Sequence, residues 1–336
     1  MIGYLFDDTL NDILLDRLLV TAQDANVPFC AISIDSMKRM LTGESAEVLL
    51  AGDGSISKGY SSLPSIVDCT FPADSKLAAT MYGSDFLREV RKQTHICIQK
   101  TVVKARFPAF LFKVGLFKHA IPTLEINDFA DLQKGMSMFP NAILKPSGGR
   151  MGAKVYQLHG NFVDIDGEGK PMTEEFCNRY LREIRLSNMG NGLLQPYMDF
   201  HTMDGRALEF KLLRHRDENG EWRDVGTYAM VGASSVVANI SKGGSFEDVL
   251  TCLKDVAGTS AEMLYDSIME LGIEVAKGIE KIFGLNAYCL GIDIAIERGT
   301  LHPYVIEANT YPNSKRFTPT IAEKRLSYYK YLQKVL

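Results

Sequence analysis

Two carboxylates and an amide near the end of the sequence have a spacing that could bind a metal ion. Asp293 lies in the apolar segment 290–296, and Glu307 and Asn309 lie two residues apart in the segment 304–309. Both segments alternate as strands do, so Glu307 and Asn309 share one face. The intervening Glu-Arg-Gly-Thr at 297–300 is typical of a hairpin turn. Paired residue numbers then sum to about 600, which sets Asp293 opposite Glu307.

Directly opposed carboxylates, with Cβ atoms ~5 Å apart, would repel each other. A divalent cation removes this repulsion, and oxygen ligands of this kind suit a Mg²⁺ ion that bridges to phosphates. A solvent-facing acidic edge is the alternative interpretation of the same residues. The apolar flanks and the amide favour the metal, so Asp293, Glu307 and Asn309 are the predicted metal ligands.

A lysine followed by a glycine-rich segment is the second candidate for chemistry. Lys145-Pro-Ser-Gly-Gly-Arg-Met-Gly152 lies between two expected strands, at 142–145 and 153–158. Its glycines allow a turn to approach a ligand and aim N–H groups at phosphate oxygens, and Lys145 adds a positive charge. The segment fits neither the P-loop, whose lysine follows the glycines, nor the Rossmann fingerprint. An ordinary hairpin loop remains the alternative.

Two further segments carry charged residues that could face a ligand. In the expected strand 207–213, Glu209 and Lys211 share one face, and Leu208, Phe210 and Leu212 share the other. The charged face suits a nucleotide or substrate cleft, and a solvated ion pair is the alternative. The segment 239–244, Asn-Ile-Ser-Lys-Gly-Gly, is another lysine–glycine candidate for phosphate, through Lys242.

The elements that must position these residues follow from the hydrophobic periodicity. Strands at 2–6 and 28–34 flank a helical pattern, which predicts an α/β lobe with a parallel sheet. The segment 101–119 reads as a helix that Pro108 interrupts. A helix at 173–187 and a long helix through Ile268, Leu271, Val275 and Ile279 precede the final strand pair.

Composition excludes several classes of protein. The chain has 336 residues and a formal net charge of −4, so we expect no nucleic-acid partner. Its six cysteines are scattered singly, which predicts buried thiols rather than a zinc site or disulfides. No apolar run reaches the ~20 residues of a membrane helix, and residues 1–6 lack the features of a signal peptide. We therefore expect a cytoplasmic protein without a membrane partner.

The order of these segments resembles the ATP-grasp superfamily. Lys145 to Gly152, Gln195-Pro-Tyr-Met198, Glu209-Phe-Lys211, residues 239–244, Gly291-Ile-Asp293 and Glu307-Ala-Asn309 follow one another as in that fold. The chain looks closest to the endospore coat-associated (YheC/YheD-like) ATP-grasp proteins, and more distantly resembles the glutathione synthetase and D-alanine–D-alanine ligase branches. The resemblance covers about residues 101–318.

The resemblance implies an α/β fold with α+β lobes in three parts. Residues 1–100 would form a Rossmann-like pre-ATP-grasp lobe, 101–190 the small lobe with the phosphate loop, and 191–336 the large lobe with the metal site. It also implies ATP as the nucleotide and Mg²⁺ as the metal, which Mn²⁺ could replace. The partners would be a small-molecule carboxylate and an amine, such as amino acids or peptides, and a homodimer is left open.

The same resemblance implies roles for individual residues. Asp293, Glu307 and Asn309 would hold Mg²⁺, and Glu209 would bind ribose or shape the adenosine pocket. The catalytic residues would be Lys211 and Lys242, which face the transferred phosphate, with Arg316 as a compensating cation. The residues that bind the nucleotide would be Lys104, Lys145, Ser147, Gly148, Gly149, Gly152, Gln195, Pro196, Tyr197, Met198 and Glu209.

Two departures from the family pattern concern the substrate. Glu209-Phe-Lys211 replaces an aspartate–aromatic–arginine triplet, and Met230 stands where many relatives carry an arginine. Both changes remove guanidinium groups that bind anions in a bidentate manner. The predicted activity is an ATP-dependent carboxylate–amine ligase that acts through an acyl-phosphate. An ATP-binding structural protein of the spore-coat type and an ATP-grasp kinase remain alternatives.

Overall fold

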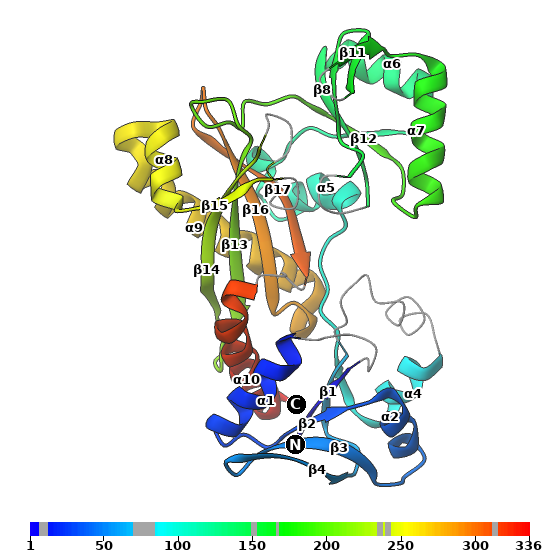
Figure 1. The fold of residues 1–336 in the computed structure, drawn as a ribbon, viewed down its shortest axis with the longest axis vertical. Coiled ribbons are helices and arrows are strands. Elements are labelled where there is room, and N and C mark those ends of the chain that lie inside the picture. The colour runs from blue at the N-terminus through cyan, green and yellow to red at the C-terminus, as the bar shows by residue number, and fades with distance from the viewer. Residues whose placement is uncertain are drawn as a thin grey trace.

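The fold comprises three lobes, each built on its own sheet and stacked along the long axis of the molecule (Figure 1). It is seen in a computed structural model that describes residues 1–6, 13–69, 85–148, 153–165, 168–233, 238, 243–310 and 315–336. The N-terminal lobe and both chain ends lie at the bottom of Figure 1, and the lobe of residues 124–196 lies at the top.

The N-terminal lobe holds a mixed sheet of six described strands in the order β4-β3-β2-β1-β5-β6. Strands β2, β1, β5 and β6 are parallel, and β3 and β4 extend the sheet as an antiparallel hairpin. Helix α1 packs on one face, and α2 and α4 pack on the other. The elements are β1 (Ile2–Leu5), α1 (Ile13–Asp24), β2 (Phe29–Ile32), α2 (Ile34–Leu41), β3 (Ala46–Gly52), β4 (Ser55–Ser61), β5 (Ile66–Asp68), α4 (Asp85–Gln93) and β6 (His95–Cys97).

The predicted parallel start of this lobe is confirmed, because β1 and β2 pair in parallel around α1. The apolar residues of α1 recur at helical spacing, so Leu14, Leu18 and Ala22 face the core together. The description of this lobe as Rossmann-like stays a prediction, as does the division of the chain at residues 100 and 190.

The small lobe holds a second sheet in the order β11-β10-β9-β8-β12-β7, covered on one face by two helices. Helix α7 begins where the Thr173 hydroxyl accepts a hydrogen bond from the N–H of Phe176, which caps the helix. The elements are β7 (Leu124–Ile126), α6 (Phe129–Met138), β8 (Asn141–Pro146), β9 (Tyr156–His159), β10 (Phe162–Ile165), β11 (Glu168–Pro171), α7 (Glu174–Leu186) and β12 (Gly192–Pro196).

The large lobe holds an antiparallel sheet in the order β15-β14-β13-β16-β17. Apolar side chains of β13 and β16 face α8, α9 and α5 in one core, and α10 packs on the other side of the sheet. The elements are η1 (Lys104–Arg106), α5 (Phe107–Lys113), η2 (Phe117–His119), β13 (Leu208–Arg216), β14 (Trp222–Val231), β15 (Ser245–Glu247), α8 (Val249–Ala257), η4 (Gly258–Ser260), α9 (Ala261–Phe283), η5 (Gly284–Asn286), β16 (Cys289–Glu297), β17 (His302–Thr310), η6 (Lys315–Phe317) and α10 (Thr318–Val335).

The sequence prediction for the segment 101–119 is wrong. Pro108 does not interrupt a helix over 101–119, because it lies in the first turn of α5. A proline is tolerated there, since the first N–H groups of a helix have no partner within it. The 3-10 helix η1 precedes it, so Lys104 lies just ahead of α5.

A buried polar cluster joins the N-terminal lobe to the large lobe. Asp68, at the end of β5, accepts hydrogen bonds from the hydroxyls of Tyr288 and Tyr329, the former at 3.0 Å. The Arg325 guanidinium of α10 lies 3.6 Å from the same carboxylate. All four side chains are buried. Because a buried charge is costly unless it is paired, this cluster fixes how the two lobes pack.

Candidate active site

The final hairpin has the predicted register. Asp293 of β16 pairs with Glu307 of β17, and Gly291 pairs with Asn309. The register shifts between Asp293 and Ile294, so that Val305 pairs with Ile294 and Ile306 is the extra residue. This bulge lets Val305 face the core while Glu307 faces the opposite side. Plain alternation would have put both side chains on one face.

The three predicted metal ligands converge in the structure. The Asn309 amide nitrogen lies 3.2 Å from a carboxylate oxygen of Asp293 and 2.6 Å from one of Glu307. A half-turn of this amide presents its oxygen to the same point, so all three side chains can supply the oxygen atoms that Mg²⁺ prefers. In the described part of the chain, no group of three or more His, Cys, Asp or Glu side chains could hold a metal. Two carboxylates and one amide are too few ligands for a cation on their own, so this donor set fits one that takes its remaining ligands from phosphates and water.

Each carboxylate is also paired with a lysine. Lys211 Nζ lies 2.7 Å and 2.9 Å from the two oxygens of Asp293, which faces it across β13 and β16. Lys104 Nζ lies 2.7 Å from Glu307. Although burial opposes both shifts, the lysine partner holds the pKa of Glu307 below its ordinary value, and Asp293 raises the pKa of Lys211. In both pairs the lysine opposes the effect of burial, which favours the protonated carboxyl group.

Glu209 and Lys145 complete the charged group. Burial and the negative charges of Asp293 and Glu307 raise the pKa of Glu209 to about 8. Burial lowers the pKa of Lys145, which interacts electrostatically with Glu307, Lys104 and Glu209. Glu209 is therefore largely protonated at pH 7, so the three lysines of the cluster face two charged carboxylates. The surplus positive charge suits the phosphates of a nucleotide.

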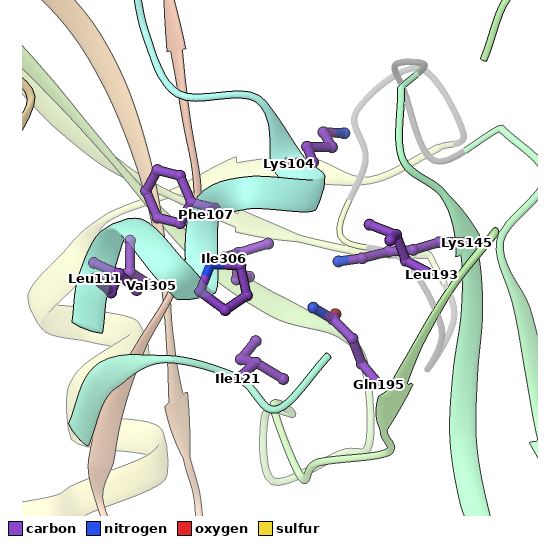
Figure 2. Close-up of a pocket in the computed structure, with 10 residues that line it drawn as sticks. Lys104, Phe107, Leu111, Ile121, Lys145, Leu193, Gln195, Val305 and Ile306 are labelled. Atoms are coloured by element: carbon purple, nitrogen blue, oxygen red, sulfur yellow. The ribbon is translucent and has the colours of Figure 1, made fainter. Parts of the chain in front are cut away.

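A narrow pocket adjoins these charges, between the large and small lobes. Figure 2 shows Lys145 and Gln195 reaching into it from the small lobe, opposite Phe107, Leu111 and Val305. Its volume is about 10 Å³, so a purine ring enters only if the lining side chains move apart. Its described lining residues are Lys104, Phe107, Pro108, Leu111, Ile121, Lys145, Leu193, Gln195, Val305 and Ile306.

The segment 195–198, which is predicted to bind the nucleotide and is named the hinge, borders this pocket. It is held by side chains that the sequence analysis missed. The Gln195 amide donates to the Thr123 hydroxyl at 2.8 Å. The Tyr197 hydroxyl lies 3.1 Å from His201 Nε2, whose Nδ1 lies 2.8 Å from Asp199. Thr123 and His201 gave no signal in the sequence, because their partners are distant or depend on the turn after β12.

The start of the glycine-rich loop is tied to the turn after α7. The Ser147 hydroxyl accepts a hydrogen bond from the N–H of Asn191 at 3.0 Å. The N–H of Gly148 donates to the Met189 carbonyl at 2.7 Å. Ser147, through its hydroxyl oxygen, and Gly148, through its N–H, thus anchor the start of the loop. Gly149 and Gly152 lie outside the described residues.

The structure does not place two of the predicted catalytic residues in the charged cluster. Lys242 lies outside the described residues. Arg316 is exposed, and its guanidinium carbon lies 5.6 Å from the centroid of the Phe317 ring. In the described part of the chain, no ion pair joins Arg316 to Asp293 or Glu307, so it does not extend the charged cluster.

Among the described residues, no helix combines the length and apolar character needed to cross a membrane.

Several known proteins are similar to this chain in sequence or in structure. The endospore coat-associated protein YheC of Bacillus subtilis (strain 168) is 22% identical over 216 residues, which are 62% of this chain; the match spans 58% of that protein's length. The D-cycloserine synthetase DcsG structure is 16% identical with a TM-score of 0.56, over 97% of this chain and 99% of that one. The ATP-grasp ligase PsnB, complexed with a minimal precursor, is 12% identical with a TM-score of 0.52, over 97% and 98% of the two chains.

A biotin carboxylase structure from Campylobacter jejuni has a TM-score of 0.57 at 12% identity, over 97% of this chain and 71% of that one. At these identities the solved structures establish the fold alone. A family model, the YheC/D-like ATP-grasp, matches residues 96–335. That range contains the charged cluster, the hinge and the glycine-rich segment, and the chain therefore belongs to the YheC/D-like ATP-grasp family.

Proposed function

We propose that this chain is a Mg²⁺-dependent ligase that uses ATP to join a carboxylate to an amine. The observation that carries the proposal is the charged cluster beside the narrow pocket between the large and small lobes. Lys104, Lys145 and Lys211 surround two carboxylates, Asp293 and Glu307, with the Asn309 amide between them. Membership of the ATP-grasp family supports ATP as the nucleotide that this cluster binds.

The proposed reaction has two steps. The substrate carboxylate attacks the γ-phosphate of ATP, which releases ADP and leaves an acyl-phosphate. The amine then attacks the acyl carbon, phosphate leaves, and an amide forms after the amine loses a proton. When bound, Mg²⁺ would neutralise charge on the transferred phosphate.

The residues of this chain would contribute positive charge and positioning. Lys145 and Lys104 would hold the phosphates by charge, and Lys211 would stabilise the negative charge that develops on the transferred group. Asp293, Glu307 and Asn309 would supply the oxygen ligands for the cation, and Gln195 with the hinge would orient the base.

A structural protein that binds ATP without ligation is the second candidate function. The printed name of the relative in Bacillus subtilis describes a protein associated with the endospore coat. The loss of guanidiniums at Lys211 and Met230 points in the same direction, because these positions lose bidentate anion contacts. The intact set of Asp293, Glu307 and Asn309 favours the ligase.

An ADP-release screen separates these functions. The chain is incubated with ATP, Mg²⁺ and pools of amino acids and short peptides, and products are identified by mass. Ligation gives ADP, phosphate and an amide whose mass is the sum of both substrates less one water. A stable phosphorylated product would instead indicate a kinase, and binding of ATP without any turnover a structural protein.

Matched variants link any turnover to the cluster. Glu307→Gln should abolish ADP release, because it removes one proposed metal ligand and the partner of Lys104. Glu297→Gln makes the same chemical change at the end of the same hairpin, beside Thr300, and should leave turnover unchanged. Equal turnover in both variants would overturn the assignment of the metal site.

A further inference from the structure

A second cavity lies in the small lobe, apart from the charged cleft. Its volume is about 260 Å³, and it opens between β9, β10 and α7. The register of the sheet sets it on the face opposite the cleft: Tyr156 pairs with Leu144, whose side chain enters the lobe core, whereas Lys145 follows on the other face. Its described lining residues are Lys154, Tyr156, Ile165, Phe176, Arg179, Tyr180 and Glu183.

Three aromatic rings form the inner wall of this cavity. Tyr156 meets Phe176 and Tyr180 edge to face, with ring centroids 5.7 Å and 5.8 Å apart. Phe176 and Tyr180 are stacked at 6.3 Å. Rings that pack on each other in this way form one continuous apolar wall. It offers faces and edges to another aromatic or branched apolar group.

One polar group within the aromatic wall lacks a partner. Tyr180 is only 3% exposed, and its hydroxyl makes no hydrogen bond within the described part of the chain. A buried hydroxyl without a partner is costly, and a ligand that brings an acceptor oxygen would remove that cost. The hydroxyl oxygen itself lies behind the aromatic wall with almost no exposed surface, so a ligand reaches this polar point when the rings move apart.

The rim of the cavity carries a surplus of positive charge. Lys154 Nζ lies 2.6 Å from Glu183, so these two charges neutralise each other. The backbone of Lys154 has a φ of 58°, a left-handed conformation that is uncommon for lysine, and the ion pair holds its side chain at the rim. Arg179 is exposed and has no ion pair among the described residues, which leaves one cation for a ligand.

We propose that this cavity binds a carboxylate attached to an aromatic body about the size of phenylalanine. The ring would pack on Tyr156, Phe176 and Tyr180, and the carboxylate would accept from the Tyr180 hydroxyl and pair with Arg179. The cavity is smaller than most pockets for drug-sized ligands, so one such group fills it. The chemistry is the same for a free aromatic acid and for the C-terminal residue of a peptide.

This proposal does not depend on the proposed ligase activity, and its test uses binding alone. N-acetylphenylalanine is titrated into the full chain by calorimetry, and N-acetylphenylalaninamide serves as the neutral control. We expect saturable binding of the acid and binding at least about tenfold weaker of the amide, because hydrogen bonds and ion pairs to a charged group are lost. Equal binding of acid and amide, or no binding of the acid, would overturn the proposal.

Variants of the lining residues test where N-acetylphenylalanine binds. Tyr180→Phe removes only the unpartnered hydroxyl, and Arg179→Gln removes only the surplus charge; each should weaken binding about tenfold or more. Arg182→Gln makes the same charge change on α7 at an exposed position that does not line the cavity, and should not alter affinity. Full affinity in both Tyr180→Phe and Arg179→Gln would place the acid elsewhere, as in the charged cleft, and would refute the site.

A last arm separates the two sources of the carboxylate. The peptide Ala-Ala-Ala-Phe is compared with N-acetylphenylalanine under the same conditions. Affinity equal to or above that of the free acid supports the C-terminus of a chain, and weaker binding supports a small aromatic acid.

Discussion

Replacing Lys211 with methionine should destabilise the protein, and a divalent cation should reverse much of the loss. The side chains of Lys211 and Asp293 are only 16% and 6% exposed, and Lys211 Nζ lies 2.7 Å from the nearer carboxylate oxygen. Methionine keeps the length of the apolar stem but removes the charge. Asp293 then remains in the sheet face without its ammonium partner.

The expected size of the loss follows from burial. Removing one partner of a buried ion pair costs about 3–5 kcal/mol. Burial already raises the pKa of Asp293 to about 6, so protonation of this carboxyl limits the penalty. We therefore expect the free energy of unfolding to fall by about 3 kcal/mol at pH 7 without metal.

Lys58→Met is the matched control. Lys58 lies 3.0 Å from Glu47, but the two side chains are 73% and 53% exposed. Ion pairs of this kind contribute about 0–1 kcal/mol, so this variant should unfold much like the original chain. Urea unfolding, followed by circular dichroism, measures both variants with and without MgCl₂.

Magnesium should stabilise Lys211→Met more than the original chain, because the cation can take the place of the lost ammonium beside Asp293 and Glu307. At a concentration 100 times the dissociation constant, binding adds about 2.7 kcal/mol to the stability of the folded state. A loss below about 1 kcal/mol without metal would refute the buried pair. An equal response of both chains to MgCl₂ would refute cation binding at Asp293.

Three further predictions concern the loop base, the lobe contact and acid stability. Gly190→Ala should weaken ATP binding in calorimetry, because a Cβ there would lie 2.2 Å from the Ser147 hydroxyl oxygen at the start of the glycine-rich loop. The control, Gly160→Ala, is also at a positive φ but has open space around it, so it should not change ATP binding. Equal affinity for ATP in the two variants would contradict this role of Ser147. Asp68→Ala should lower the free energy of unfolding in urea by about 3–5 kcal/mol, since it removes the carboxylate that faces the buried Arg325 guanidinium and accepts from two tyrosine hydroxyls. A loss below about 1 kcal/mol would show that this polar cluster does not hold the two lobes together. Burial and nearby positive charge lower the pKa of His215 to about 3, so the unfolded chain binds its proton first as pH falls. Stability should then be complete above about pH 6.5 and decrease by up to about 4–5 kcal/mol towards pH 3, and His215→Gln should flatten that decrease in urea titrations at successive pH values; identical pH profiles would contradict it.

The sequence predicted best what depends on short-range periodicity. The pairing of Asp293 with Glu307 followed from alternation in two strands and one short turn, and the structure has this register. The charged face of β13 with Glu209 and Lys211 followed from the same rule. The prediction that the six cysteines are buried, free thiols is also confirmed.

What the sequence did not predict depends on contacts between distant segments. The bulge at Ile306 cannot be seen in an alternating pattern, and yet it decides that Val305 and Glu307 face opposite sides. The hairpin of β10 and β11 has no apolar alternation in β11, because that strand is exposed along its whole length. Arg316 follows the predicted metal strand closely in the sequence, but in the structure it is exposed and lies beside the Phe317 ring.

The pocket beside the cluster was also hidden in the sequence. Phe107 and Leu111 are of the type found in any apolar core, and only the packing of α5 beside Val305 of β17 brings them to the pocket. The sequence also gave no indication of a binding site at Arg179 and Tyr180 of α7, because an exposed arginine next to a buried tyrosine is common on amphipathic helices.

The most direct test of the central claim is anomalous diffraction from manganese in crystals grown with a non-hydrolysable ATP analogue and MnCl₂. Asp293, Glu307 and Asn309 supply the oxygen atoms that should bind the cation, and Mn²⁺ has the same preference for such ligands. We predict one strong anomalous peak in contact with both carboxylates and the phosphates of the analogue. A peak on the phosphates with Lys211 and Lys104 still paired to the carboxylates would contradict this account.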